Sequence, residues 1–430
     1  MKTYNVLLIG SGGREHALAW KMAQSPLLDH LYTVPGNPGT AQYGTNISVD
    51  TSDFEKVLGV VNEHDIDIVV VGPEKPLVDG ITDFLTGKGV NVFGPTSRAA
   101  QLEGSKSFAK EFMQRHNIPT AAYKTFKSSQ FDEAFEYIKT ENRYPVVLKA
   151  DGLAGGKGVF ICENETEVKK RLRQLSNDEK LKDAASTLVV EEFMQGQEVS
   201  VFAICDGEIA RVLHNAQDHK RIGEGDTGLN TGGMGAYAPA PLLTPELKNE
   251  IEKSIIQPTI DGMKADGNPY LGILYAGLMI TEEGPKVVEY NCRFGDPECQ
   301  VILPPLKSDL LDLILAATGS SLKNEIIQLT NRYYCSVVLA SGGYPSSYEK
   351  GFEITGISDI DKKSLVFHSG TTNKDGKLVT DGGRVLNVVG NGEKLQDAID
   401  HAYKNVKRIT FKNSYYRSDI GKKGLKTLES

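Results

Sequence analysis

Four short apolar runs alternate with helical stretches over the first 95 residues, and this alternation constrains the fold more than any other feature. The runs are YNVLLIG, HLYTV, DIDIVVVG and VNVFG, with a helix expected from Glu15 to Gln24 after the first. Strands separated by helices predict a parallel, doubly wound sheet. Glycine-rich turns at 10–13, 36–39 and 72–73 follow the ends of runs. Folds of this kind bind ligands at such strand ends.

The rest of the chain predicts two further domains. After the linker GPTSRAAQLEGSK, the strands PVVLKA and GVFIC flank a glycine-rich loop, which makes that loop the tip of a hairpin. EVSVFAIC alternates, which suits a half-exposed strand, and the glycine-rich segment 223–245 predicts a long functional loop. GILYAGLMI and KVVEYNCRF predict a second hairpin. From Tyr333 onward, strand-like runs and glycine turns predict a small β-rich domain.

These patterns together predict a multidomain chain of the α/β and α+β classes. The expected domains are 1–103, 104–327 with a lid subdomain at about 122–192, and 328–430. A net charge of −8 argues against a general nucleic-acid binder. No apolar run approaches the ~20 residues of a membrane span. The five cysteines include no C-x-x-C pair, which indicates free thiols and a cytoplasmic protein.

The loop KADGLAGGKGV at 149–159 carries lysines and glycines but is not a P-loop, because its spacing differs and Lys157 is followed by glycine rather than Ser or Thr. Lys149, at a strand end, can reach a nucleotide phosphate. Gly155 and Gly156 allow the tip to close on phosphate oxygens together with Lys157. The alternative is a mobile surface turn with a solvated lysine. Lys106, after the linker glycine, is a further candidate for the phosphates.

The turn GSGGREHA resembles a dinucleotide fingerprint only in part. Glu15 replaces the third glycine, and no acid ends the second strand, so an NAD site is disfavoured. Backbone N–H groups of Gly12 and Gly13 at the mouth of a helix, with Arg14 beside them, predict an anion site instead. The alternative is a tight strand-to-helix turn with no ligand.

The run KVVEYNCRFGDPE predicts the metal chemistry. Glu289 and Asn291 lie two apart on a strand, so their oxygens project from one face and suit Mg²⁺. Arg293 is expected on the same face as a clamp for a transferring phosphoryl group. In AQDHKR, Asp218 could hold an ammonium and Arg221 a carboxylate or phosphate. The alternatives are a surface ion pair for Glu289 and a solvated charge run for AQDHKR.

In combination, these features resemble the ATP-grasp ligases, and more closely the phosphoribosylamine–glycine ligase family. The motifs occur in order from Ile9 to Leu386. They are GGREHALAW, PGNPGT, VVGPEKPLVDG, FGPTSRAAQLEGSK, KADGLAGGKGV, QDHKR, NTGGMGAYAPAP, EYNCRFGDPE and GGRVL. Two departures, GSGG for the usual GNGG and Leu229 for an expected proline, remove no charged group.

The resemblance implies ATP-dependent ligation of glycine to 5-phosphoribosylamine through glycyl phosphate, with Mg²⁺ or Mn²⁺, in a monomer that binds neither nucleic acid nor membrane. It places adenine near Glu191, Glu192 and Phe193, the ribose hydroxyls of ATP at Glu198, and its phosphates at Lys106 and Lys149. It places phosphoribosylamine at Gly12, Gly13, Arg14, Asn37 and Gly39, and glycine near Asp218 and Arg293. Arg293, Lys157 and Asp218 are the expected catalytic residues.

Two alternatives remain at this point. One is another ATP-grasp enzyme, biotin-carboxylase-like or formate-using, which would share the nucleotide site and activate a different acid. The motifs QDHKR and NTGGMGA favour the glycine ligases over it. The other is a nucleotide-regulated binding module or an NAD-linked oxidoreductase, which the missing ribose acid and the E-x-N-x-R strand disfavour.

Overall fold

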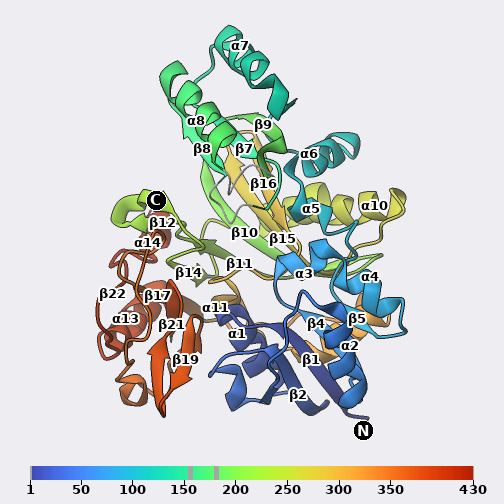
Figure 1. The fold of residues 1–430 in the computed structure, drawn as a ribbon, viewed down its shortest axis with the longest axis vertical. Helices are drawn as coiled ribbons and strands as arrows, with labels where there is room; N and C mark the ends of the chain where they lie inside the picture. The colour runs from blue at the N-terminus through green and yellow to red at the C-terminus, as the bar shows by residue number, and fades with distance from the viewer. Residues whose placement is uncertain (1, 154–157, 179–183, 430) are drawn as a thin grey trace.

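The computed structural model describes residues 2–153, 158–178 and 184–429. Its N-terminal sheet is parallel with the strand order β3-β2-β1-β4-β5 (Figure 1). The strands are β1 (Tyr4–Gly10), β2 (Leu28–Pro35), β3 (Thr45–Asn46), β4 (Ile68–Val71) and β5 (Val92–Phe93). The four predicted strands are confirmed, and the short polar β3 was missed. Helices α1 (Gly13–Met22), α2 (Phe54–Glu63), α3 (Glu74–Asp79) and α4 (Ile81–Thr86) connect them.

A second body, which we call the lid, projects from the molecule at the top of Figure 1. It consists of a sheet in the order β6-β9-β7-β8 with helices α7 (Phe131–Glu141) and α8 (Glu165–Asn177). The strands are β6 (Tyr123–Lys127), β7 (Val146–Ala150), β8 (Val159–Cys162) and β9 (Thr187–Glu192). The lid has a hydrophobic core of its own, which includes Phe126, Leu148 and Val168.

The predicted lysine-bearing hairpin of the lid is confirmed, because Lys149 of β7 pairs with Val159 of β8. Gly155, Gly156 and Lys157 at its tip lie outside the described residues. Helices α5 (Gln101–Gly104) and α6 (Lys106–Arg115) precede the lid in the chain and connect it to the N-terminal region.

The largest sheet joins the core of the molecule to its C-terminal region. Its order is β16-β15-β10-β11-β14-β17-β21-β18, with β22 paired to β17. The core strands are β10 (Gln197–Asp206), β11 (Ala210–Asp218), β14 (Gly235–Ala238), β15 (Leu271–Thr281) and β16 (Gly284–Asn291). The C-terminal strands are β17 (Tyr333–Ser341), β18 (Leu365–His368), β21 (Arg384–Gly392) and β22 (Ser414–Tyr415). The β-rich C-terminal region is therefore continuous with the core sheet.

Two expectations about this sheet were wrong. Strand β10 is buried on both faces rather than half-exposed, because Val201 packs in one hydrophobic cluster and Phe202 in the other. Helix α12 (Leu310–Thr318) packs against β10. The polar residue that suggested exposure, Ser200, is buried and donates to the Tyr275 hydroxyl at 2.9 Å.

Segment 223–245 is also not a plain loop. It contains most of the hairpin formed by β12 (Arg221–Gly223) and β13 (Thr227–Asn230), and all of β14. Strand β14 pairs with β11 on one side and β17 on the other. These partners are distant in the sequence, so the glycine-rich composition alone did not reveal a strand.

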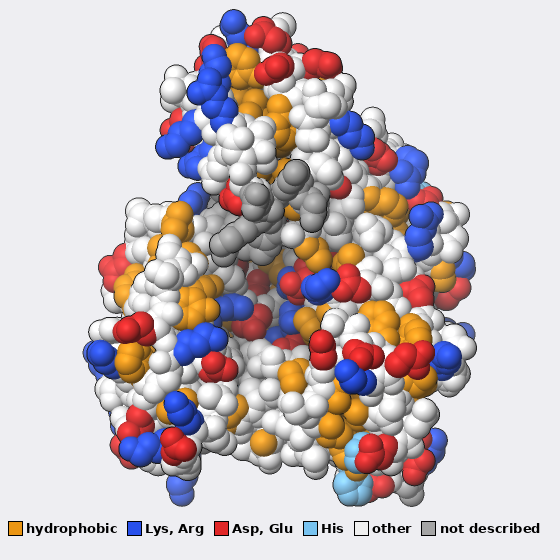
Figure 2. Space-filling view, viewed as in Figure 1, with side chains coloured by type: hydrophobic (Ala, Val, Ile, Leu, Met, Phe, Trp, Pro, Cys, Tyr) orange, Lys and Arg blue, Asp and Glu red, His pale blue; other side chains and the backbone are white. Residues whose placement is uncertain are grey.

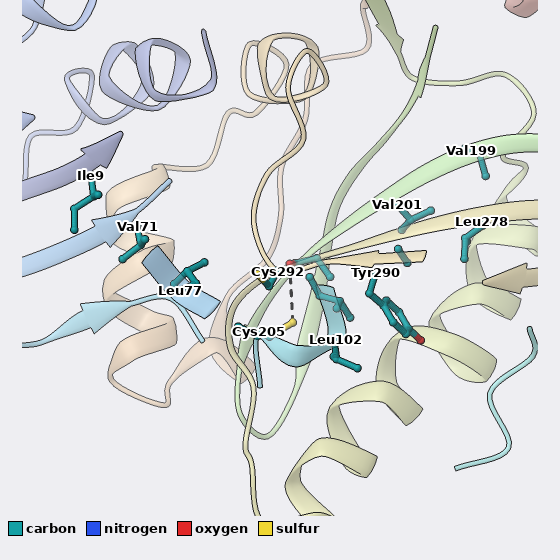
Figure 3. Packing of buried hydrophobic residues seen from close by; sticks show 14 of the residues in the cluster. Ile9, Val71, Leu77, Leu102, Val199, Val201, Cys205, Leu278, Tyr290 and Cys292 are labelled. Carbon is teal, nitrogen blue, oxygen red and sulfur yellow. Dashed lines mark hydrogen bonds between the residues drawn. The ribbon is translucent and has the colours of Figure 1, made fainter. Parts of the chain in front are cut away.

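The remaining elements surround this sheet. The helices are α9 (Pro245–Ile251), α10 (Gln257–Ala265), α11 (Cys299–Ile302), α13 (Leu395–Val406) and α14 (Lys422–Glu429), and β19 (Thr371–Lys374) pairs with β20 (Lys377–Thr380). The largest hydrophobic cluster among the described residues joins the N-terminal sheet to the core sheet: Figure 3 shows Ile9 and Val71 on one side and Val201 and Leu278 on the other, with Cys292 between them.

All five cysteines are free thiols, as predicted, and the structure shows that all five are buried. They lie at positions 162, 205, 292, 299 and 335. Among the described residues, no helix combines the length and apolar character needed to cross a membrane.

Candidate active site

A charged cavity of about 460 Å³ lies where the core sheet, the lid and the N-terminal sheet meet. Figure 2 shows a hollow near the centre of the molecule with acidic and basic side chains around it. The predicted site residues that line the cavity are Arg14, Lys106, Lys149, Glu191, Asp218, Glu289, Asn291 and Arg293. An adjoining cavity of about 1040 Å³ shares Lys149, Asp218 and Glu289 and adds Phe193, Glu198 and Arg221.

Glu289 on β16 has the electrostatic environment that a divalent cation site requires. Lys220 lies 3.4 Å from its carboxylate and is the main reason that its pKa falls to about 2; Lys149 and Lys106 act in the same direction. The carboxylate is therefore ionised at neutral pH. Asn291, two residues on, lines the same cavity. This oxygen-only pair fits a hard cation such as Mg²⁺.

The protein offers that cation few ligands. Among the described residues, no group of three or more His, Cys, Asp or Glu side chains is arranged to hold a metal ion. Strand β15, opposite Glu289, presents Gly277 in register with it. A Cβ at Gly277 would lie 3.2 Å from Glu289 Cγ, so the glycine leaves room for the carboxylate. A cation here would rely on ligands from phosphate and water as well.

Arg293 lies beyond the end of β16, which stops at Asn291, so its expected place on the strand face was wrong. Its guanidinium is held 2.7 Å from Glu103 and 3.1 Å from Glu74. Burial alone would lower the pKa of Arg293, but these two carboxylates outweigh that effect and raise it. Arg293 thus joins α3 of the N-terminal region to α5 while it lines the cavity.

The predicted anion site at the start of α1 already has protein acceptors. The Gly12 N–H donates to Glu15 at 2.6 Å, and the Arg14 N–H donates to Asp296 at 3.3 Å. The Arg14 guanidinium pairs with Glu15 at 2.6 Å. A Cβ on Gly13 would lie 2.6 Å from both Asn387 Nδ2 and Gln300 Nε2, so this glycine permits close packing. In this structure carboxylates close the turn and Arg14 faces the cavity, so the predicted anion site at Gly12, Gly13 and Arg14 stays a prediction.

Asn37 and Gly39 are bonded within the protein rather than placed on either cavity described above. The Asn37 amide nitrogen donates to the carbonyls of Ser11 at 2.8 Å and His368 at 2.9 Å. Its amide oxygen accepts from the Gly39 N–H at 2.7 Å. These bonds fasten the second turn of the N-terminal sheet to the C-terminal region, and the predicted ribose contact stays a prediction.

Two buried lysines meet one carboxylate at the lid end of the cavity. Lys149 and Lys110 each lie 3.0 Å from the same Glu191 oxygen, Oε2. Sequence reasoning missed Lys110, because a single lysine in FAKEF resembles a solvated helix residue. Burial lowers the pKa of Lys110 to about 8 and also lowers that of Lys106. The Lys106 ammonium donates to the Gly152 carbonyl at 3.2 Å.

Comparison with known proteins shows where this arrangement belongs. Three family models match in succession: the phosphoribosylglycinamide synthetase N domain at residues 4–103, its ATP-grasp (A) domain at 104–299, and its C domain at 334–423. A phosphoribosylamine–glycine ligase of Agrobacterium fabrum (strain C58 / ATCC 33970) is 49% identical over 416 residues, which is 97% of each chain. The chain belongs to the phosphoribosylamine–glycine ligase family.

Solved structures agree with this assignment. The crystal structure of a phosphoribosylamine–glycine ligase from Thermotoga maritima has a TM-score of 0.84 and 35% identity, and the match covers 96% of this chain and 99% of that one. The biotin carboxylase domain of the Hydrogenobacter thermophilus 2-oxoglutarate carboxylase matches at a TM-score of 0.74 and 17% identity, over 97% of this chain and 92% of that one. The second likeness shows a shared fold only. The resemblance inferred from the sequence motifs is thus confirmed at the level of the family and the fold.

Within this ligase-family site, Asp218 lies at an end of the cavity that also holds Glu298 and Lys220, to which the sequence assigned no role. Burial raises the pKa of Asp218 to about 7 and that of Glu298 above its usual value. Lys220 bridges Glu198 at 3.2 Å and Glu289 at 3.4 Å. Lys220 belongs to the run AQDHKR. Only the folded structure shows that its positive charge lies between the carboxylates of Glu198 and Glu289.

Two other predicted residues lie to one side of the charged cavity of the ligase-family site. The Arg221 guanidinium donates to the Gly228 carbonyl at 2.8 Å and faces the adjoining cavity. Glu192 accepts from the Ala122 N–H at 3.0 Å at the edge of the lid.

Proposed function

We propose that this chain catalyses the ATP-dependent ligation of glycine to 5-phosphoribosylamine, giving glycinamide ribonucleotide, ADP and phosphate in purine biosynthesis. Relatives that bear the name of this activity match the chain over nearly their whole length. The observation that carries the proposal here is the cavity in which ionised Glu289 is surrounded by Lys220, Lys149 and Lys106. Such a cavity can hold a triphosphate and its cation next to a small acid.

The first step forms glycyl phosphate. A carboxylate oxygen of glycine attacks the γ-phosphorus of ATP, and the bond to the β,γ-bridging oxygen breaks to release ADP. The transferring group carries negative charge, which Lys149, Lys106 and Arg293 would balance. Lys157, which lies outside the described residues, would complete this proposed set. Glu289 and Asn291 would hold Mg²⁺ or Mn²⁺, and the ion would add positive charge at the phosphate oxygens.

The second step forms the amide. The amine of phosphoribosylamine attacks the acyl carbon of glycyl phosphate, the C–O bond to phosphate breaks, and phosphate leaves. The attacking nitrogen loses a proton, and we assign the acceptor to Asp218, whose raised pKa suits proton transfer near neutral pH. No protein nucleophile is needed, because ATP activates the acid.

The substrates occupy the two adjoining cavities in this proposal. Adenine lies near Glu191 and Phe193, with Glu198 at the ribose hydroxyls, while phosphoribosylamine approaches from the side of Arg14. Arg221 lies beside the nucleotide, and glycine lies between Asp218 and Arg293. The lid, which has its own core, excludes water from the acyl phosphate. We further propose a cytoplasmic monomer with domains at 1–103, 104–327 and 328–430.

The decisive experiment measures ADP release from MgATP with glycine, with and without freshly generated phosphoribosylamine. Steady-state ADP release over many turnovers that requires both substrates, and that falls at least a hundredfold in Glu289→Ala, would support the ligase and its cation site. The matched control is Glu283→Ala, which removes an exposed acid at the turn of the same hairpin. ADP release that is equal without glycine would overturn the choice of acid.

A further inference from the structure

The two carboxylate oxygens of Glu191 differ in their hydrogen-bond partners. Oε2 receives both Lys110 and Lys149 at 3.0 Å, whereas Oε1 is buried and has no hydrogen-bond partner among the described residues. The side chain is 3% exposed and lines the charged cavity. A buried polar atom without a partner is rare in native proteins and calls for an explanation. A donor from a ligand is the explanation that the cavity offers.

Lys110 fixes the carboxylate in this orientation. Its ammonium donates to Thr120 Oγ1 at 2.8 Å and to the Ala121 carbonyl at 3.4 Å, and it is 2% exposed. The Thr120 hydroxyl in turn donates to the Val287 carbonyl of β16 at 2.7 Å. Because its three partners all lie within the protein, Lys110 cannot swing toward a ligand without breaking them.

Lys149 ties the same carboxylate to the same strand. It donates to the Val288 carbonyl of β16 at 3.1 Å. Glu191 on β9 is thus connected to β16 through Lys110 and Thr120 on one side and through Lys149 on the other. Both lysines draw Oε2 toward themselves, which leaves Oε1 as the oxygen available to another group.

The surroundings of Glu191 suit a planar base. Leu102, Ala109 and Met113 line the same cavity and supply apolar surface. An ionised carboxylate oxygen only accepts hydrogen bonds, so it selects a ligand that presents N–H. A 6-aminopurine presents an amino group at that edge, whereas a 6-oxopurine presents a carbonyl that the carboxylate repels.

We propose that Lys110 is a positioning residue for base selection: it holds Glu191 so that Oε1 accepts from the amino group of adenine and rejects 6-oxopurine nucleotides. The inference rests on the nucleotide placement in the proposed function. It assigns Lys110 an effect on discrimination, separate from any effect on the transferring phosphate. A purely structural Lys110 would tie α6 to the lid and would leave the preference between bases unchanged.

The test compares ATP with inosine triphosphate, which has an oxo group at position 6. Dissociation constants of both nucleotides are measured by calorimetry on the full chain, for wild type and Lys110→Met. We expect ATP binding to weaken about tenfold while inosine triphosphate binding changes less than threefold, so that the ratio collapses. Lys139→Met, an exposed lysine of the lid helix α7, is the matched control. An unchanged ratio in Lys110→Met would overturn the proposal.

A double variant tests whether Lys110 acts through Glu191. In Glu191→Gln the amide can also donate, so the two nucleotides should bind almost equally, and adding Lys110→Met should change the ratio no further. Additive losses would contradict the inference. If Lys110→Met does not fold, Glu191→Gln is the deciding variant. An unchanged ratio of the dissociation constants for ATP and inosine triphosphate in that variant would overturn the proposal. These binding ratios are independent of ADP release, so failure of the ligase activity is distinguishable from failure of this inference.

Discussion

At the scale of single residues, burial and neighbouring lysines together give the acids of the site different protonation states. Lys220 and its neighbours keep Glu289 ionised, whereas burial brings the pKa of Asp218 close to neutrality. Burial also raises the pKa of Glu103, although the positive charge of Arg293 opposes this shift. One cavity can therefore hold a permanent cation ligand beside a group that exchanges a proton.

The pH dependence of the reaction follows from Asp218. Its carboxyl is mostly protonated below pH 7 and ionised above, because burial raises its pKa to about 7. Only the ionised form accepts a proton, so the rate should rise with pH through about 7 and fall about tenfold per unit below it. Initial rates of ADP release from pH 5.5 to 8.5 check this. Asp218→Asn should be slower throughout and lack the acid limb; an unchanged limb would assign it to another group.

The ion pairs of Arg293 predict an unequal effect of two substitutions. Glu103 is 7% exposed and Glu74 is 34% exposed in their pairs with Arg293. Glu103→Ala leaves a buried guanidinium with one partner fewer and should cost roughly 3 kcal/mol, whereas Glu74→Ala should cost about 1 kcal/mol or less. Urea denaturation followed by Trp20 fluorescence measures both. Equal losses would show that burial does not set the strength of these pairs.

At the scale of elements, the sequence predicted what depends on local pattern. The parallel strands β1, β2 and β4 are apolar runs, and the two hairpins have strands adjacent in the chain. Strand β14 and the Lys110–Glu191 pair depend on partners far away in sequence, so no local pattern revealed them. The sequence also did not reveal that Asp296 accepts from the Arg14 N–H at the turn after β1, because the two residues are 282 positions apart.

Replacing each of two glycines by alanine should change the stability of the protein in opposite directions. A Cβ on Gly235 of β14 would lie 2.6 Å from the Ser336 carbonyl of β17, so Gly235→Ala should destabilise by roughly 1–3 kcal/mol. Gly59, inside α2, has open space around it, and Gly59→Ala should stabilise by about 0.5–1 kcal/mol. Thermal unfolding of both variants against wild type checks the pair. Destabilisation by both would mean that the helix position is constrained by something other than contact.

At the scale of the whole molecule, one sheet joins the core to the C-terminal region while the lid keeps a separate hydrophobic cluster. The cavity lies between these bodies, so a ligand that contacts both should stabilise the native state as a whole. The sheet and the large cluster in Figure 3 hold the other regions together. Because the lid packs around a cluster of its own, we expect it to move more than the other regions when a nucleotide binds.

Removal of the cation tests this view. At a concentration 100-fold above its dissociation constant, MgATP should stabilise the protein by about 2.7 kcal/mol, seen as a higher unfolding temperature. Chelation by EDTA should remove most of this gain in wild type, because Glu289 then faces the phosphates without a cation between them. In Glu289→Ala, MgATP and ATP with EDTA should give similar shifts. A gain that survives EDTA unchanged in wild type would contradict the cation site.

Because all five thiols are buried, their reaction with an alkylating reagent reports local opening of the structure around each one. A thiol reacts as the thiolate, and burial raises the pKa of each of these cysteines, so alkylation requires that the surrounding structure open. Cys162 lies in the lid, Cys205 and Cys292 in the core, Cys299 in α11, and Cys335 in the C-terminal region. The rate at which each cysteine is alkylated, measured by mass spectrometry, would rank these regions by how often each one opens.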